Sequence, residues 1–341
     1  MAFQPIELNR KITLAKRPIG LPKTSDFHLV YSRMPSPSAG EVLFRSIYLS
    51  LDPHLRWRMS EAQYCSAPMA IGEMMAGGVV ARVVESDAAG FRVGDTVEGM
   101  LGWREYGVVS GEDLRKIDPG TAPISTALSV LGMPGLTAYF GLLDLTDPQP
   151  GETVVVSGAA GGIGMLVGQI AKICGCRVVG VAGSEAKCSW LRDELGFDEA
   201  FSLEPGIDLD ARLAELCPAG IDVYFDNTGG AVSDAALRRI NSRARVSVCG
   251  QASQSNLEKA ESGPRWLGRL IVKEAKVEGF KVSAYAARFA EGLAQLGVWL
   301  AAGKLKYREE VAQGLEAAPQ AFISMLQGEN QGKQLVQLAA S

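Results

Sequence analysis

The chain has 341 residues, of which 47% are hydrophobic and 21% are charged, so it is long enough for two ordinary domains and too apolar for a disordered chain. Its net charge of -4 and isoelectric point near 5.5 argue against a nucleic-acid partner, because phosphate binding requires a clustered basic face. An anionic cofactor can still bind, since a helix N-terminus and one or two local cations are sufficient.

Six cysteines are scattered through the chain without a framework of spacings, which favours a reduced compartment over disulfide bonds. The first 25 residues interleave charged and apolar residues, and no stretch approaches the ~18 consecutive apolar residues of a membrane span. We therefore expect a soluble cytoplasmic protein with no export signal and no membrane partner.

The first 125 residues are predicted to be rich in β-structure. Short runs of alternating apolar and polar residues recur there, separated by turn signals such as Asp118-Pro-Gly120. Several short strands at this spacing favour a small barrel or sandwich. The clearest predicted strands are 41–48, 78–85 and 106–110.

The pattern changes after Gly132, where residues 133–144 are predicted to be helical and strands then alternate with helices. Continuous Val and Ile runs separated by helices predict a parallel sheet that is covered on both faces. The predicted strands are 153–157, 177–182, 200–203, 221–226 and 244–249, and the predicted helices between them are 162–174, 184–195, 209–216 and 231–240.

A last helix is predicted over 291–302, and the final ~40 residues return to a mixed pattern. We therefore expect a β-rich domain over 1–128, a nucleotide-binding α/β domain over 129–300, and a segment over 301–341 that returns to the first domain. A ligand is expected in a cleft between the two domains.

The glycine-rich turn Gly158-Ala-Ala-Gly-Gly-Ile-Gly164 directly follows a predicted strand and opens a predicted helix. Glycines in this context allow a sharp turn, a close approach to a pyrophosphate and tight packing of the helix on the strand. The free N–H groups and dipole of the helix N-terminus favour an anion there. A plain tight turn is the alternative, but the alternating strands and helices around the motif favour a dinucleotide site.

Preference between NADP and NAD is usually decided at the end of the second strand of such a domain, where an acidic residue accepts hydrogen bonds from the ribose 2′-hydroxyl of NAD. Here Gly183 and Ser184 follow that strand, and Lys187 can reach a 2′-phosphate. This pattern favours NADP. Two alternatives remain: Glu185 is a ribose ligand or a helix N-terminal acid, and Lys187 is a phosphate ligand or a solvated lysine.

The sequence resembles the medium-chain dehydrogenase/reductase superfamily, and within it the leukotriene hydroxydehydrogenase/prostaglandin reductase group that includes alkenal and curcumin reductases. Ordered motifs carry the resemblance almost from end to end. They are Tyr48–Pro53 (YLSLDP), Gly132–Tyr139 (GMPGLTAY), Val156–Gly164 (VSGAAGGIG), Gly168–Lys172 (GQIAK), Ile221–Gly230 (IDVYFDNTGG), Glu278–Phe280 (EGF) and Gly328–Lys333 (GENQGK).

The resemblance implies a Rossmann doubly wound parallel sheet inserted into a GroES-like β-rich domain, and commonly a homodimer. It implies NADPH-dependent reduction of the carbon–carbon double bond of α,β-unsaturated ketones or aldehydes. By position, the implied cofactor contacts are Thr137, Gly161, Gly162, Ile163, Gly164, Ser184, Lys187, Asn227, Cys249, Gly250, Phe280 and Asn330.

Three positions depart from the pattern of this group. Leu203 stands where many members have a tyrosine beside the adenosine phosphate, and Ser255 precedes Asn256 where a tyrosine often follows the Cys-Gly turn. The Asp-Pro-Tyr of the group is Asp52-Pro53-His54 here. The first difference weakens the preference for NADP, and the other two alter the pocket and leave the proton donor open.

Zinc-dependent dehydrogenases require thiolate, imidazole and carboxylate ligands at suitable spacings. This chain has two histidines, His28 and His54, and no Cys-x-x-Cys pair, so we expect no metal site. Conjugate reduction needs none, because it requires orientation, a hydrogen-bond donor to the carbonyl oxygen and a proton for the α carbon.

His54 is the predicted catalytic proton donor, because imidazole titrates in the range that suits proton transfer. A histidine that only shapes the pocket is the alternative, and the cofactor ribose with solvent could also supply the proton. Tyr48, Tyr64 and Tyr285 are weaker candidates, since tyrosines in β-rich regions more often serve in packing. Two other functions remain open: a quinone oxidoreductase of the same superfamily and a non-catalytic dinucleotide-binding protein.

Overall fold

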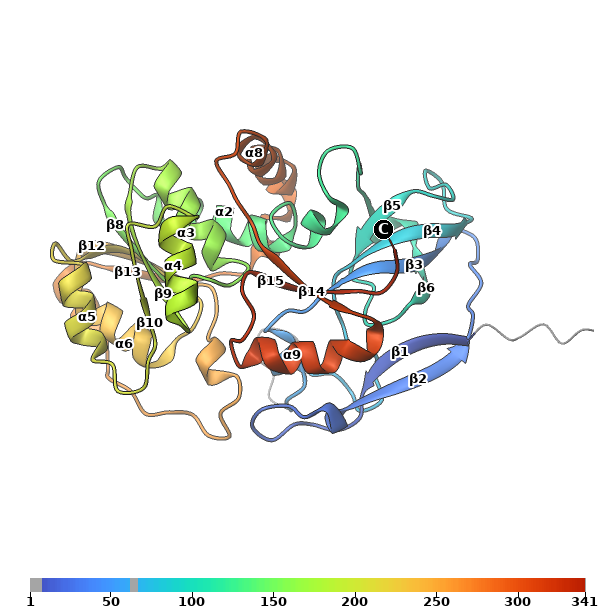
Figure 1. Ribbon diagram of the computed structural model, residues 1–341, viewed down its shortest axis with the longest axis horizontal. Coiled ribbons are helices and arrows are strands. Elements are labelled where there is room, and N and C mark those ends of the chain that lie inside the picture. The colour runs from blue at the N-terminus through green and yellow to red at the C-terminus, as the bar shows by residue number, and fades with distance from the viewer. Residues whose placement is uncertain (1–7, 62–66, 341) are drawn as a thin grey trace, which may run out of the picture. The chain divides into compact units, whose positions relative to one another are not determined.

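The computed structural model describes residues 8–61 and 67–340 (Figure 1). The chain divides into two compact units. Unit 1 contains the residues up to Leu128 together with Glu310–Gln327 and the residues from Gln334 onward. Unit 2 contains Ser129–Glu309 and a short second segment, Gly328–Lys333.

Unit 2 is built on a six-stranded sheet with the strand order β10-β9-β8-β11-β12-β13, in which every neighbouring pair is parallel. This order, with the first strand in the centre and the chain reversing between β8 and β11, is that of the doubly wound dinucleotide-binding sheet. The predicted parallel sheet is therefore confirmed. The strands are β8 (Thr153–Ser157), β9 (Arg177–Ala182), β10 (Glu199–Ser202), β11 (Ile221–Asp226), β12 (Ile240–Val248) and β13 (Lys276–Gly279).

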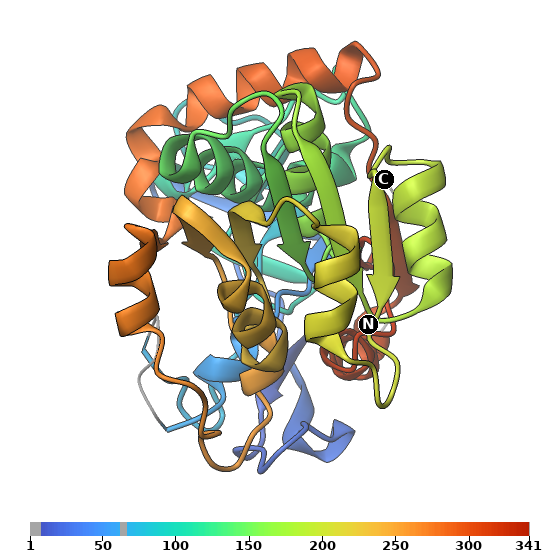
Figure 2. The ribbon, with the colours of Figure 1, turned by 90° about the vertical axis from the view of Figure 1, so that its left-hand side faces the viewer.

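Helices cover both faces of this sheet. Because successive side chains of a strand point to opposite faces, each strand contributes to the core on both sides. On β8, Val154 and Val156 are buried against one face, and Val155 is buried against the other. Figure 2 shows helices on either side of the sheet. The first face packs on α2 (Met133–Thr146), α3 (Gly164–Ile173), α4 (Glu185–Asp193) and α8 (Phe289–Ala301), and the second on α5 (Leu209–Leu216) and α6 (Gly230–Arg238). The helix α7 (Leu267–Lys273) precedes the edge strand β13.

Unit 1 contains an antiparallel sheet in which β14, β15, β3, β4, β5 and β7 follow one another and β6 also pairs with β3. A separate antiparallel pair, β1 and β2, was not predicted from the sequence. The strands are β1 (Leu8–Leu14), β2 (Phe27–Arg33), β3 (Glu41–Ser50), β4 (Val79–Ser86), β5 (Thr96–Gly99), β6 (Tyr106–Ser110), β7 (Arg115–Lys116), β14 (Glu309–Gln313) and β15 (Lys333–Gln337), and the helices are α1 (Leu55–Arg58) and α9 (Ala318–Leu326).

The core of unit 1 is centred on the fully buried Trp103, which stacks on Phe27 at 5.8 Å between ring centroids and meets Phe322 edge-on at the same distance. Phe322 belongs to α9, so the C-terminal part of the chain completes the core of the β-rich unit. None of the helices in the described residues has the length and apolar composition that crossing a bilayer requires.

Candidate dinucleotide-binding site

The glycine-rich turn connects the central strand β8 to α3 at the carboxyl edge of the parallel sheet. The neighbouring strand β11 ends at Asp226 and continues into Asn227 at the same edge. Strands β8 and β11 are the pair between which the strand order reverses, and ligands of doubly wound sheets bind at this reversal point.

The turn requires glycine at its first and last positions. Gly158 has a φ of +59°, in the left-handed region that favours glycine. A Cβ added to Gly164 would lie 2.3 Å from the carbonyl oxygen of Gly158 and 2.7 Å from the Cα of Ala159, which are backbone atoms that cannot move aside. Glycine at these two positions therefore lets α3 start directly above the strand.

The start of α3 presents unpaired backbone donors. Within the part of the chain that the structure describes, the N–H groups of Ile163 and Gly164 have no acceptor, whereas the N–H of Gly161 donates to Gly158 O at 3.1 Å and Gly161 forms a parallel β-bridge with Gly332. Adjacent free N–H groups at a helix N-terminus fit a bound pyrophosphate. The cofactor contacts predicted at Gly161–Gly164 therefore lie at a helix N-terminus with free backbone donors, and their contact with a cofactor stays a prediction.

The end of β9 carries no acidic side chain, and Gly183 and Ser184 follow it. The Ser184 hydroxyl accepts a hydrogen bond from the Lys187 N–H at 3.4 Å and so caps α4. Glu185 forms a 2.5 Å ion pair with Arg192 on the same helix. That pairing fits the reading of Glu185 as an acid in the first turn of α4.

The segment 328–333 of unit 2 lies against the glycine turn. The N–H of Gly332 donates to Ala160 O at 2.8 Å, and the side chain of Lys333 packs on Gly162, where an added Cβ would lie 2.9 Å from its Cδ. Asn330 donates to Gly332 O at 2.9 Å, and the Lys187 ammonium donates to Gly328 O. The predicted contacts Lys187 and Asn330 are thereby linked through one segment.

Asn227, Cys249 and Gly250 meet at the ends of β11 and β12. The Asn227 amide donates to Ser157 O at 2.8 Å, and the N–H groups of Cys249 and Gly250 donate to Asp226 O at 2.9 and 3.0 Å. Burial and the nearby Asp226 carboxylate raise the pKa of the Cys249 thiol to about 12, so this thiol stays neutral at physiological pH.

Thr137 is part of α2, and Phe280 packs against this helix. The Thr137 hydroxyl donates to Met133 O at 2.7 Å within the helix, so its donor is already used there. Phe280 packs on Gly141, where an added Cβ would lie 2.3 Å from the ring, and it meets Phe225 edge-on at 6.5 Å. Phe280 is thus anchored between α2 and β11.

Asp226, Ser157 and Gln251 were not among the residues predicted from the sequence. Hydrogen bonds from Ser157 and Gln251 to Asp226 join the segments that follow β8, β11 and β12. The signal was present: an acidic residue ends a run of buried strand residues, where an unpaired charge would be costly. The motif containing Asp226 was recognised, but the buried position of its carboxylate depends on tertiary packing.

His54 lies in unit 1, where it is exposed and precedes the short helix α1. Tyr48 is part of β3 and packs against the buried cluster around Val80, and Tyr285 stacks on Phe140 at 4.7 Å in unit 2. Burial raises the pKa of Tyr285 above its ordinary value. Tyr64 lies outside the described residues.

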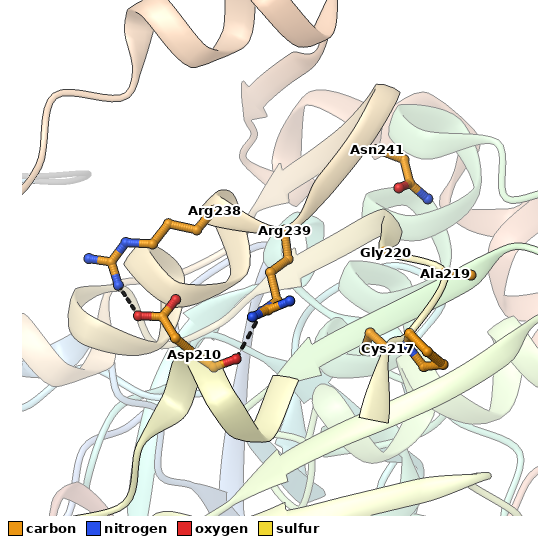
Figure 3. A pocket seen from close by; sticks show the side chains of 8 residues that line it. Asp210, Cys217, Ala219, Gly220, Arg238, Arg239 and Asn241 are labelled. Atoms are coloured by element: carbon orange, nitrogen blue, oxygen red, sulfur yellow. Dashed lines mark hydrogen bonds and ion pairs between the residues drawn. The ribbon is translucent and has the colours of Figure 1, made fainter. Parts of the chain in front are cut away.

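A pocket of about 540 Å³ in unit 2 lies at the opposite, amino edge of the sheet (Figure 3). The Arg238 guanidinium forms an ion pair with the Asp210 carboxylate there, and Arg239 donates to Asp210 O at 2.9 Å. Both cations thus already have acceptors, and the pocket is distant from the glycine turn because the strands are parallel. Among residues 8–61 and 67–340, no group of three or more His, Cys, Asp or Glu side chains is arranged to hold a metal ion.

Comparisons with known proteins agree with this geometry. Residues 10–117 match a family model described as the N-terminal domain of oxidoreductase, and residues 162–297 match one described as zinc-binding dehydrogenase.

Two curated relatives and one solved structure match almost the whole chain. A putative NADP-dependent oxidoreductase of Bacillus subtilis is 48% identical over 97% of this chain and 98% of its own length. An NADPH-dependent curcumin reductase of Escherichia coli is 44% identical over 98% of this chain and 99% of its own length. The crystal structure of CurA from Vibrio vulnificus in complex with NADPH is 44% identical, covers 97% of this chain and 100% of that chain, and has a TM-score of 0.93.

Identity at this level over nearly the whole length confirms the resemblance noted in the sequence. The chain belongs to the medium-chain dehydrogenase/reductase superfamily and, within it, to the group of prostaglandin, alkenal and curcumin reductases.

Proposed function

We propose that this protein is an NADPH-dependent reductase of the carbon–carbon double bond in α,β-unsaturated ketones and aldehydes. The observation that carries the proposal is the start of α3, where the free N–H groups of Ile163 and Gly164 lie at the reversal point of the sheet. The relatives named as NADPH-dependent curcumin reductase and NADP-dependent 2-alkenal reductase support the choice of reaction.

The cofactor is NADP(H) rather than NAD(H). The end of β9 offers a serine hydroxyl at Ser184 and an ammonium group at Lys187, and Glu185 is held by Arg192. A lysine near the ribose favours a 2′-phosphate, whereas a free carboxylate there would repel it.

NADPH supplies the hydride for conjugate reduction when it is bound. The chain holds the pyrophosphate on the backbone of Gly161–Gly164, and Asn227 and Asn330 provide amide groups at the same carboxyl edge. The proposed reaction includes no zinc ion, because the sequence lacks the pattern of zinc ligands.

The test is NADPH oxidation by the purified protein with a panel of enones, enals, quinones and simple alcohols. The proposal expects turnover with enones and enals. Turnover of quinones alone would instead support the quinone oxidoreductase alternative. Tight NADPH binding without turnover of any compound would indicate a non-catalytic binding protein.

We propose His54 as the proton donor, and the variant His54→Phe tests this role. An acid role predicts that His54→Phe lowers kcat by about 10²-fold, the scale of general acid catalysis. Equal turnover of wild type and variant between pH 5 and pH 8 would contradict it. In that case the cofactor ribose and solvent would supply the proton.

We also propose that unit 2 is the cofactor domain, that unit 1 is the GroES-like substrate domain, and that the protein is cytoplasmic. The five cysteines in the described residues carry no disulfide bond, which suits a reducing compartment. Fluorescence labelling of the protein in cells tests the location.

We propose a homodimer formed through the β13 edge of the sheet. Strand β13 has a sheet neighbour on one side, and the adjacent α7 exposes Leu267, Ile271 and Val272 by 77, 80 and 79%. A second copy suits an edge strand and an apolar helix, because a two-fold axis brings identical edges together. Light scattering should give a dimer for wild type and for the control Val93→Glu in unit 1, and a monomer for Ile271→Glu; a dimeric Ile271→Glu would contradict this interface.

A further inference from the structure

The side chain of Asp226 is a buried carboxylate at the end of β11, only 3% exposed. Its two oxygens accept six hydrogen bonds from uncharged donors. Oδ1 accepts from Ser157 Oγ (3.1 Å), Tyr224 OH (3.0 Å), Thr228 N (3.1 Å) and Gly229 N (2.8 Å), and Oδ2 accepts from Ser233 Oγ (2.7 Å) and Gln251 Nε2 (3.2 Å).

These donors belong to three connections at the carboxyl edge of the sheet. Ser157 directly precedes the glycine turn, Thr228 and Gly229 follow β11, and Gln251 follows the Cys249–Gly250 turn after β12. Each connection carries predicted cofactor contacts. One carboxylate therefore joins the three segments from which the dinucleotide cradle is built.

The connections are packed closely enough for this link to fix their spacing. An added Cβ on Gly250 would lie 2.9 Å from Asn227 O, and one on Gly229 would lie 2.2 Å from Gln251 Oε1. The Gln251 amide donates both to Asp226 Oδ2 and to Gly250 O at 2.9 Å. A shift of one connection would thus displace the next.

The carboxylate has no ion-pair partner among the described residues, since no Lys, Arg or His side chain lies within ion-pair distance of it. A buried charge of this kind is tolerated when donors satisfy its lone pairs, and the N-terminus of α6 just beyond Gly229 adds a favourable dipole.

We propose that Asp226 is the positioning residue of the dinucleotide site: its carboxylate holds the connections after β8, β11 and β12 at the spacing that NADPH requires. This inference rests on the proposed cofactor and adds a residue that need not touch it. The expected consequence is a defect in cofactor binding that exceeds any defect in fold stability.

Asp226→Asn is the informative substitution, because it keeps the size of the side chain and replaces one acceptor oxygen by an N–H₂ donor. That donor would face Ser233 Oγ or Gln251 Nε2, so a hydroxyl or an amide must turn away. The matched control is Asp222→Asn, on the same strand at the amino edge, where the carboxylate accepts from Thr153 N at 2.8 Å and Asn241 Nδ2 at 2.7 Å.

Two measurements on wild type and both variants test the role. Hydrogen exchange of the cofactor-free protein should be faster in Asp226→Asn at 157–158, 227–229 and 249–251 together, and the Kd for NADPH should rise about tenfold. Asp222→Asn should speed exchange at the amino edge only and leave the Kd within about twofold. Equal Kd changes in the two variants would overturn the proposal.

A second substitution gives a rescue that general destabilisation would not produce. Adding Gln251→Glu to Asp226→Asn places a carboxylate opposite the new N–H₂ group, and we expect the Kd to return to within about threefold of wild type. Gln251→Glu alone sets two carboxylates together and should weaken NADPH binding.

If Asp226→Asn does not fold, Gln251→Ala removes one donor and should raise the Kd about threefold. An unchanged Kd would then overturn the proposal. Wild-type protein that fails to bind NADPH would contradict the proposed function itself, which distinguishes the two failures.

Discussion

At the amino edge of the six-stranded sheet, half-buried carboxylates lie against cations: Glu152 pairs with Arg245 at 2.6 Å and Asp198 pairs with Lys172 at 2.8 Å. At the carboxyl edge, Asp226 is held by hydroxyl, amide and backbone donors instead. Glu152 and Asp198 at the amino edge thus have charged partners, whereas Asp226 at the carboxyl edge has neutral ones.

This difference separates stability from binding. Ion pairs at the amino edge join segments that are far apart in the chain, and they act on the stability of the fold. At the carboxyl edge, the N–H groups of Ile163 and Gly164 are left without acceptors, which favours an anion there. Changes at the amino edge should therefore alter the free energy of unfolding, and changes at the carboxyl edge should alter cofactor affinity.

The largest effect is expected from Gly164→Ala. Its methyl group would overlap the backbone at Gly158 and Ala159, so α3 must move and the Kd for NADPH should rise by about 100-fold or more. Fluorescence titration with NADPH measures this. The control is Gly297→Ala on α8, where nothing lies within 4 Å of the added atom and the helix should gain about 1 kcal/mol of stability. Wild-type affinity in Gly164→Ala would place the pyrophosphate elsewhere.

Arg245→Met tests the amino edge. Arg245 binds both oxygens of Glu152 and donates to Thr146 O at 2.7 Å, and its loss should lower the free energy of unfolding by about 2–3 kcal/mol. Urea unfolding measures this change, and the Kd for NADPH should stay the same. Arg243→Met breaks an exposed pair with Glu274 and should change stability by less than about 0.5 kcal/mol. A large affinity loss in Arg245→Met would remove the distinction between the edges.

Lys187→Ala addresses the adenosine end of the site. If its ammonium binds a 2′-phosphate, KM should rise about tenfold for NADPH and less than about twofold for NADH. Steady-state kinetics with both cofactors provide the ratio. Lys172→Ala, a lysine at the amino edge, should leave both KM values unchanged. An equal rise in KM for both cofactors would mean that Lys187 acts through its hydrogen bond to Gly328 O and does not bind the 2′-phosphate.

The smallest effect concerns acid stability at Asp198. Burial acts to raise the pKa of this carboxyl, but hydrogen bonds from Lys172 and the Val178 N–H outweigh it, so the pKa lies below its ordinary value. A lowered pKa stabilises the folded state at neutral pH, and this stabilisation is lost as the pH falls below about 4. Asp198→Asn should therefore flatten the acid limb of the stability curve by about 0.5–1 kcal/mol. An unchanged acid limb in urea unfolding between pH 5 and pH 3 would show that Asp198 contributes nothing to it.

Much of unit 2 could be predicted from the sequence, because its signals are local. Buried Val and Ile runs identify the strands, and the bounds of 153–157, 177–182 and 221–226 agree with β8, β9 and β11. The glycine turn also identifies its own place, since Gly158 needs a left-handed φ and Gly164 a missing side chain. The pair β1–β2 was missed because its strands are partly exposed and carry charged residues, which weakens the apolar pattern.

What the tertiary structure decided is which distant residues meet. The sequence contains Ser157, Asp226 and Gln251 but does not reveal that one carboxylate joins them, because hydrogen bonds between side chains 69 and 25 residues apart depend on strand order. It contains Gly328–Lys333 but does not reveal that this segment lies on the glycine turn of unit 2. By itself the sequence determined the local backbone, through side-chain periodicity and glycine sterics. The packed sheet decided which distant residues come together at the site, because only packing fixes the distances between segments that are far apart in the chain.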